Sequence, residues 1–139
     1  WAALVAERLA LPMAYVRPEP KKHGMGRQVE GPHADGHRVV LLEDLISTGG
    51  SSLRCVEALR HEDAEVIEVL ALFSYGLPRA EEAFRADRAG LRVLTTFPQL
   101  METARERKLL DRADLASLEA WRSDTEAWSR AHGGPGGRP

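Results

Sequence analysis

Two adjacent carboxylates followed by a loop of small polar residues form the part of this sequence best equipped for chemistry. Glu43 and Asp44 end an apolar run, and two residues later the chain continues as Ser47, Thr48, Gly49, Gly50, Ser51. Glycine lets the backbone approach a ligand closely, and successive N–H groups at the start of a helix attract an anion. Carboxylates repel phosphate but accept hydrogen bonds from vicinal hydroxyls, as on a ribose. The segment therefore predicts a site for a sugar phosphate, with a phosphate monoester as the anion.

The elements around this loop must bring it to the edge of a sheet. Residues 39–42 predict a strand buried on both faces, and Leu53, Val56 and Leu59 then recur at helical spacing. The loop thus joins the carboxyl end of a strand to the amino end of a helix, where open α/β sheets bind ligands. An ordinary glycine-rich turn would leave the paired acids unexplained. The loop has neither the lysine of a Walker loop nor the glycine spacing of a dinucleotide fingerprint.

A second segment, residues 15–31, gathers positive charge. It places four cations and a histidine within eleven residues, at Arg17, Lys21, Lys22, His23 and Arg27. Its prolines and glycines exclude a regular helix. A solvated basic loop is the ordinary interpretation of such a cluster.

The order of residues in both segments resembles one enzyme family. Residues 39–52 resemble the phosphoribosyl pyrophosphate (PRPP) loop of type I phosphoribosyltransferases: a hydrophobic strand, two acids, two apolar residues, then Ser-Thr-Gly-Gly-Ser. Residues 15–31 run Arg, three residues, Lys, one residue, His-Gly, then a Glu-Gly ending, which is similar to the catalytic flap of orotate phosphoribosyltransferases. The resemblance extends from Trp1 to about Trp128. It implies an α/β fold with a parallel sheet flanked by helices and a mobile flap.

The resemblance also implies roles for individual residues. Backbone donors of residues 48–51 would grip the 5-phosphate of PRPP, Glu43 and Asp44 would hold the ribose hydroxyls, and Ser47 would touch orotate. The flap would approach the pyrophosphate; many relatives carry a lysine where this chain has Pro18, a contact that is lost here or supplied by Lys22. The candidate catalytic residues are Lys21, His23 and Asp44. The candidate substrate-binding residues are Arg17, Lys21, Lys22, His23, Glu43, Asp44, Leu45, Ile46, Ser47, Thr48, Gly49, Gly50 and Ser51.

The implied activity is that of an orotate phosphoribosyltransferase, a glycosyltransferase of pyrimidine biosynthesis. It transfers the ribosyl 5-phosphate of PRPP to orotate, with Mg²⁺ bridging pyrophosphate and ribose oxygens. The family's flap closes over a neighbour's site, so a homodimer is expected. Two alternatives stay open: a phosphoribosyltransferase for another base, and a non-catalytic PRPP-sensing regulator that binds RNA. The net charge of −2 argues against the regulator, which needs a basic face.

Length and composition limit the size of the core and the kinds of partner that we expect. A chain of 139 residues that is 43% hydrophobic can bury one compact core. Without a global positive charge we expect no nucleic acid and no acidic membrane as partner. One cysteine, Cys55, allows neither a disulfide framework nor a metal cluster within one chain. Apolar runs fall well short of the ~20 residues of a membrane span, and the cytoplasm is the expected compartment.

The chain alternates helices and strands as α/β proteins do. The sequence predicts strands at 13–17, 38–44, 65–74 and 91–95, and helices at 1–9, 50–61, 78–89, 98–109 and 112–122. Gly90 is expected to cap the third helix, and a capping box at 123–126 to restart a last turn. We expect one phosphoribosyltransferase domain over 1–131 and a disordered tail over 132–139. Because the first helix begins at Trp1 with no strand before it, the resemblance implies that the first core strand and the hood are missing. We therefore expect this piece alone to bind PRPP weakly and to catalyse little or nothing.

Overall fold

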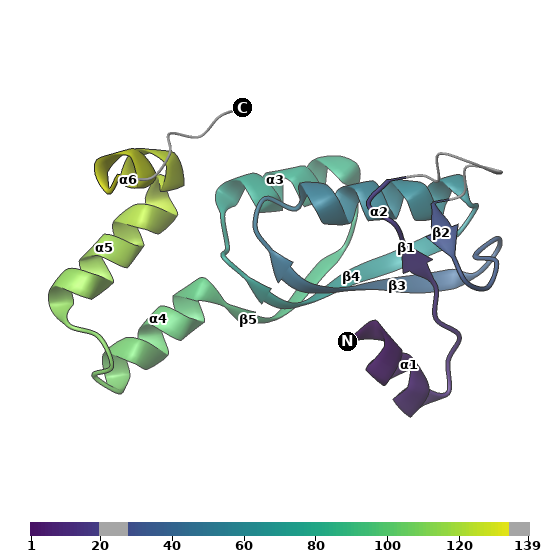
Figure 1. Ribbon diagram of the computed structural model, residues 1–139, viewed down its shortest axis with the longest axis horizontal. Helices are drawn as coiled ribbons and strands as arrows, with labels where there is room; N and C mark the ends of the chain where they lie inside the picture. The colour runs from purple at the N-terminus through teal and green to yellow at the C-terminus, as the bar shows by residue number, and fades with distance from the viewer. Residues whose placement is uncertain (20–27, 134–139) are drawn as a thin grey trace. The chain divides into compact units, whose positions relative to one another are not determined.

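The computed structural model describes residues 1–19 and 28–133 (Figure 1). Residues 20–27, which carry Lys21, Lys22 and His23, and residues 134–139 lie outside the described part. The chain divides into two compact units, Trp1–Leu94 and Thr95–Pro139. The candidate loop and both predicted acids belong to the first unit.

The first unit is built on a three-stranded sheet. Its strands are β3 (Arg38–Ile46), β4 (Glu65–Ser74) and β5 (Leu91–Thr96), in the order β3-β4-β5. β3 and β4 run parallel, from Arg38 opposite Glu65 to Ile46 opposite Ser74, with a register shift between Val39 and Val40. The predicted parallel pairing is confirmed, because the helix between these strands returns the chain to the starting edge of the sheet.

Two helices cover one face of this sheet. α2 (Gly50–His61) follows β3, and α3 (Pro78–Asp87) follows β4; Figure 1 draws both above the strands. Val69 and Ala71 are two residues apart on β4, so they point to the same face, and both are 0% exposed. They form the main core together with Ile46, Val56, Ala80 and Phe84. The loop between β3 and α2 is therefore anchored at both ends in packed structure.

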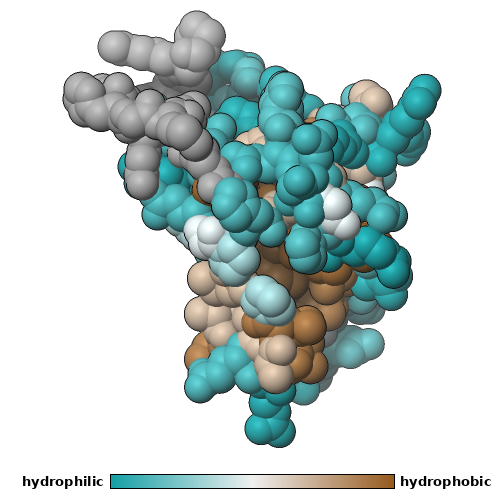
Figure 2. All heavy atoms as spheres, turned by 90° about the vertical axis from the view of Figure 1, so that its right-hand side faces the viewer, coloured by the Kyte–Doolittle hydropathy of each residue, from teal (hydrophilic) through white to brown (hydrophobic). Residues whose placement is uncertain are grey.

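The other face of the sheet carries exposed apolar side chains. Val40 on β3 is 47% exposed and Ile67 on β4 is 42% exposed. The helix α1 (Ala2–Leu9) adds Leu4 and Leu9, at 63% and 59% exposure, and every residue of α1 is exposed or half-buried. Figure 2 shows apolar side chains gathered on the lower part of the first unit. The apolar face of α1 predicted from spacing thus exists but is not packed in a core.

The remaining two strands form a separate ribbon. β1 (Tyr15–Val16) pairs antiparallel with β2 (Val29–Glu30). The ribbon is extended by backbone of Arg17, whose N–H donates to the Gln28 carbonyl at 2.9 Å. The strand predicted at residues 13–17 is present at Tyr15–Val16, but it pairs with a nearby antiparallel segment and lies outside the parallel sheet. That partner, β2, was not predicted, since two residues are too short to show alternation.

The second unit is helical, with α4 (Phe97–Glu106), α5 (Arg112–Ser123) and α6 (Thr125–Ala131). Phe97 packs against Trp121, the two ring centroids lying 5.4 Å apart, and the Trp128 Nε1 donates to the Ser117 hydroxyl at 3.0 Å. Both tryptophans thus serve packing within this unit. Among the described residues, no helix is both long and apolar enough to cross a membrane.

Two predicted helix caps are wrong in detail. α3 ends at Asp87 and its left-handed cap is Arg88, with φ 56°, instead of Gly90. Gly90 is already engaged with the sheet, where its carbonyl accepts from the Val69 N–H at 2.8 Å. At the start of α6 the cap is Asp124, whose carboxylate accepts from the Ala127 N–H at 2.8 Å, because α5 continues through Ser123.

Candidate functional site

The candidate phosphate loop consists of Ser47, Thr48 and Gly49, between the end of β3 and the start of α2. Gly49 is the residue before the helix, and no side chain caps the first turn of α2. Its first N–H groups are therefore available to an external acceptor, and the helix dipole favours an anion there. The side chains of Ser47, Thr48 and Ser51 are exposed. The structure thus brings the predicted phosphate donors together at one helix terminus.

Gly49 is required by geometry. Its φ of 81° lies in the left-handed region, and an added Cβ would come within 2.7 Å of the Phe84 ring. Phe84 is 3% exposed in the core, so it cannot move aside without opening a cavity. Phe84 of α3 thus packs next to the loop at Gly49. The sequence could not reveal this because the two residues are far apart in the chain.

We expect Gly49→Ala to destabilise the protein by about 2 to 4 kcal/mol, the sum of left-handed strain and overpacking. Urea unfolding measures this loss. Gly36→Ala is the matched control, because Gly36 has φ 68° but meets nothing within 4 Å. It should lose only the strain contribution of about 1 to 2 kcal/mol. Equal losses in the two variants would contradict the supporting role of Phe84.

The two acids at the end of β3 have different surroundings. Val39 and Leu41 pack in the cores beneath the helices, so Glu43, two residues further, points to the same face. Glu43 is half-buried, and its Oε1 accepts a hydrogen bond from the Ser52 hydroxyl at 2.8 Å. Asp44, the next residue in the strand, is exposed. The carboxylate of Glu43 is therefore held by a hydrogen bond, and that of Asp44 is open to solvent.

The two apolar residues after the acids also differ. Ile46 is 1% exposed and lies in the main core, and its carbonyl accepts from the Tyr75 N–H at 3.1 Å. Its side chain anchors the loop and is not available to a substrate. Leu45 is 39% exposed at the mouth of the loop.

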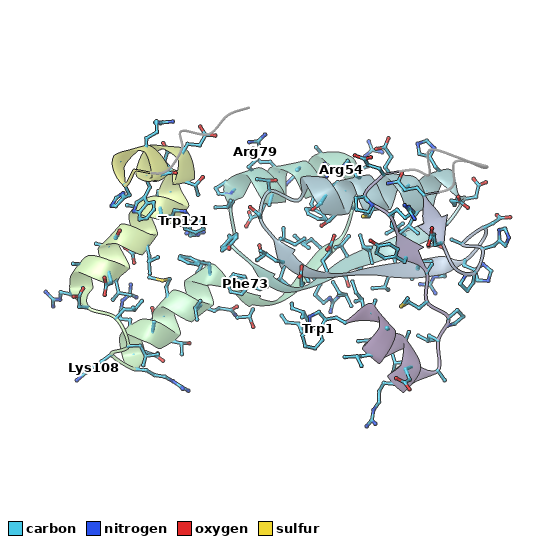
Figure 3. All side chains as sticks on the ribbon, in the orientation of Figure 1. Trp1, Arg54, Phe73, Arg79, Lys108 and Trp121 are labelled. Atoms are coloured by element: carbon cyan, nitrogen blue, oxygen red, sulfur yellow. The ribbon has the colours of Figure 1, made fainter. Side chains whose placement is uncertain are left out.

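The pKa of the Cys55 thiol depends on the charge of Glu43. Burial raises the pKa of Cys55, the Glu43 carboxylate raises this pKa further, and the Arg54 guanidinium lowers it. Figure 3 shows Arg54 on α2, the helix that also carries Cys55. A negative charge near the thiol disfavours the thiolate.

Removing that charge should therefore speed alkylation of Cys55. In Glu43→Gln the pKa of Cys55 falls toward its ordinary value, more thiolate is present at neutral pH, and iodoacetamide should react a few-fold faster. Burial is the larger cause and stays, so the effect is modest. Glu57→Gln removes an exposed glutamate of the same helix and should leave the rate unchanged. An unchanged rate in Glu43→Gln would place Glu43 away from α2.

Of the flap cations, only Arg17 lies in the described part of the chain. Its Nη1 lies 2.9 Å from Glu30 Oε1, across the β1–β2 ribbon, and the two side chains are 39% and 40% exposed. Gln28 Nε2 also donates to the Arg17 carbonyl at 2.8 Å. The side chain and the carbonyl of Arg17 are thus both held within the ribbon, close in sequence to residues 20–27. Lys21, Lys22 and His23 lie outside the described residues, and their roles stay predictions.

The end of β4 lies beside the end of β3 in the parallel sheet. Ser74, which pairs with Ile46, is 4% exposed, and its hydroxyl accepts from the Gly76 N–H at 3.0 Å. Phe73 meets Tyr75 edge to face at 5.7 Å. Arg79 is exposed on α3, as Figure 3 shows, and has no assigned role.

Ser52 is the main residue that sequence reasoning missed. It lies on α2 four residues before Val56 and seven before Leu59, so it belongs to the helix face that packs on the sheet. A polar residue at an otherwise apolar position was the available signal. In the structure it is 0% exposed.

Within residues 1–19 and 28–133, no group of three or more His, Cys, Asp or Glu side chains could hold a metal ion. Glu43 and Asp44 provide hard carboxylate oxygens, the donors that Mg²⁺ prefers. Such a pair fits an ion that takes most of its ligands from water and a phosphorylated substrate.

Comparison with known proteins agrees with this arrangement. The family model of the phosphoribosyl transferase domain matches residues 1–92. The orotate phosphoribosyltransferase of Bacillus caldolyticus is 49% identical over 127 residues, which are 91% of this chain and 62% of that protein. That of Cutibacterium acnes is 47% identical over 131 residues, 94% of this chain and 61% of that protein. The chain thus spans less than two thirds of the length of these curated relatives.

Solved structures agree on the fold. The crystal structure of orotate phosphoribosyltransferase from Aeropyrum pernix has a TM-score of 0.63 at 36% identity, covering 74% of this chain and 57% of that one. The family model covers both the loop and the β1–β2 ribbon, and the observed parallel sheet flanked by helices is the fold that the resemblance implied. The chain therefore belongs to the phosphoribosyl transferase domain family.

Proposed function

We propose that this protein transfers the ribosyl 5-phosphate of PRPP to orotate, giving orotidine 5-phosphate and pyrophosphate. The observation that carries the proposal is the loop between β3 and α2, where uncapped amides of a helix terminus follow two carboxylates. Curated relatives named orotate phosphoribosyltransferase match this chain over 91% and 94% of its length, which supports orotate as the acceptor.

The loop binds the ribose 5-phosphate part of PRPP in this proposal. Backbone donors of Thr48, Gly49, Gly50 and Ser51 hold the phosphate, and Ser47 at the start of the loop touches orotate. Asp44 and Glu43 accept hydrogen bonds from the ribose hydroxyls, Asp44 through an exposed carboxylate and Glu43 through one that is held by Ser52 of α2. Leu45 borders the site, and Ile46 anchors it from the core. A related orotate phosphoribosyltransferase of Mycobacterium tuberculosis H37Rv, with a TM-score of 0.54 at 29% identity over 65% of this chain and 50% of that one, was crystallised with PRPP.

The basic segment neutralises the leaving group. The transition state carries positive charge on the ribose ring and negative charge on the departing pyrophosphate. Lys21, Lys22 and His23 would meet the pyrophosphate from the segment that follows Arg17, with charge-assisted hydrogen bonds that strengthen as its charge grows. Arg17 pairs with Glu30 and retains further guanidinium donors for an anion.

Mg²⁺ belongs to the proposal as an ion that enters with PRPP. Glu43 and Asp44 are the carboxylates of the site that would hold it, directly or through water. When bound, the ion offsets negative charge on the pyrophosphate oxygens.

We further propose that the protein acts as a homodimer in which the flap serves the neighbouring site. The exposed apolar side chains of α1 and of the open sheet face support an association surface, because monomeric proteins rarely expose large apolar patches. Tyr15, at the start of the ribbon, is also 55% exposed.

The proposal is tested by incubating the full-length protein with PRPP, Mg²⁺ and each of orotate, uracil and adenine, and following the nucleotide product by chromatography. We expect PRPP-dependent formation of orotidine 5-phosphate and none from the other two bases. Product from adenine or uracil, with orotate untouched, would contradict orotate as the acceptor. PRPP binding without any product, together with RNA retention on a filter, would contradict an enzymatic role.

A further inference from the structure

The hydroxyl of Ser52 occupies a position that would otherwise be apolar. α2 packs its sheet-facing side through Val56 and Leu59, which are 0% and 5% exposed, and Ser52 continues that side toward the loop at 0% exposure. Burying a hydroxyl costs free energy unless it is hydrogen-bonded. A serine at this position is therefore expected to have a specific partner.

That partner is the carboxylate of Glu43. The Ser52 hydroxyl donates to Glu43 Oε1 at 2.8 Å, joining the first turn of α2 to the end of β3 across the loop. A glutamate side chain has several rotatable bonds, and a charge-assisted hydrogen bond from a buried donor restricts them. One carboxylate oxygen is thus held by the helix, while the second keeps its acceptor capacity.

We propose that Ser52 is a positioning residue that orients Glu43 so that its second oxygen accepts from a ribose hydroxyl of PRPP. The inference rests on the proposed function, because it assigns Glu43 to the ribose. It adds a residue that touches no substrate and acts only through the carboxylate. Pre-orientation matters because a ligand that must itself order a mobile side chain binds less tightly.

The electrostatic contact between Glu43 and Cys55 agrees with this placement. Cys55 lies three residues after Ser52, nearly one turn along α2, and the Glu43 carboxylate raises the pKa of its thiol. The carboxylate thus lies against α2 near two of its side chains, and Ser52 donates a hydrogen bond to it.

The test compares two ligands on the same chain by calorimetry, ribose 5-phosphate and inorganic phosphate. Ser52→Ala should weaken ribose 5-phosphate by about three- to tenfold, the range typical of coupled neighbours. Inorganic phosphate should bind unchanged, because the loop backbone holds it and Glu43 does not. Ser52→Cys, which keeps the shape but offers only a weak donor, should behave as Ser52→Ala and provides a second variant if the alanine chain is unstable.

A double-mutant cycle separates positioning from simple packing. In a Glu43→Ala background, Ser52→Ala should cause no further loss of ribose 5-phosphate affinity. Ser74→Ala is the matched control, since it removes the hydroxyl of another buried serine, 4% exposed, which accepts a hydrogen bond from the Gly76 amide. It should lower the melting temperature without changing the preference for ribose 5-phosphate over phosphate.

Three results would overturn the inference. Ser52→Ala and Ser52→Cys could both leave ribose 5-phosphate binding unchanged, or they could weaken inorganic phosphate as much as ribose 5-phosphate. In the Glu43→Ala background, Ser52→Ala could weaken ribose 5-phosphate as much as it does in the wild-type chain. In each case the wild-type chain still prefers ribose 5-phosphate, and the proposed function stands. If the wild-type chain bound ribose 5-phosphate no better than phosphate, the ribose assignment of Glu43 would fail and the inference with it.

Discussion

In the full-length protein, exchange of Asp44 for asparagine should lower the turnover of orotidine 5-phosphate synthesis by about 100-fold, the scale of losing one preorganised electrostatic partner of a transition state. Asp44 is exposed at the mouth of the loop, so the fold should not change. Asparagine keeps the shape and one acceptor oxygen but loses the negative charge that favours a cationic ribose ring. The measurement is steady-state turnover with saturating PRPP and orotate, beside a thermal melt of each variant.

The matching variants sharpen this result. Glu43→Gln should lose less, because the amide oxygen of glutamine can still accept from Ser52. Asp35→Asn is the control, because Asp35 is an exposed aspartate between β2 and β3, away from the loop. It should keep full turnover. Normal synthesis by both Asp44→Asn and Glu43→Gln would show that these acids do not hold the ribose.

The second large effect in the full-length protein is expected at the flap. Lys21→Ala should lower turnover by about 100-fold or more, because its charge-assisted bond to pyrophosphate strengthens as the leaving group departs. PRPP binding should weaken far less than turnover, since the loop of residues 47–51 still holds the 5-phosphate. Lys108→Ala is the control: Lys108, labelled in Figure 3, is exposed in the second unit.

Mixed dimers test whether the flap is shared. Chains with Lys21→Ala are combined with chains with Asp44→Asn, each nearly inactive by itself. If the flap serves its neighbour, the Lys21→Ala chain keeps an intact Asp44 and receives an intact Lys21 from its partner. Activity should then reappear in verified mixed dimers. No recovery in such dimers would count against sharing.

The core elements of the sheet could be predicted from sequence because their signals are local and strong. β4 occupies the predicted residues 65–74, and α2 the predicted residues 50–61. The strand is a nearly continuous apolar run that ends at Ser74 and Gly76, and the helix has apolar residues at helical spacing after Gly49 and Gly50. The parallel pairing followed from the helix between the strands.

The features that sequence could not give depend on distant partners. Residues 15–16 pair with residues 29–30. A strand of two residues is too short to show a sequence pattern that would reveal this pairing. The Gly90 carbonyl accepts from Val69, and Phe84 leaves no room for a side chain at position 49. Both arrangements form only once the chain has folded around the sheet. The same applies to Ser52 and Glu43, where the local pattern showed a misplaced polar residue but not its partner. The roles of Lys21, Lys22 and His23 stay predictions.

Amide chemical shifts during a titration with PRPP test most directly whether residues 43–51 hold a ribose 5-phosphate. In the ¹⁵N-labelled chain with Mg²⁺, the resonances of Thr48, Gly49, Gly50 and Ser51 should shift most, because their N–H groups would donate to the 5-phosphate. In Asp44→Asn the same amides should still shift, at a higher PRPP concentration. Shifts confined to other parts of the chain, with the four loop amides unchanged, would contradict the assignment of this loop to PRPP.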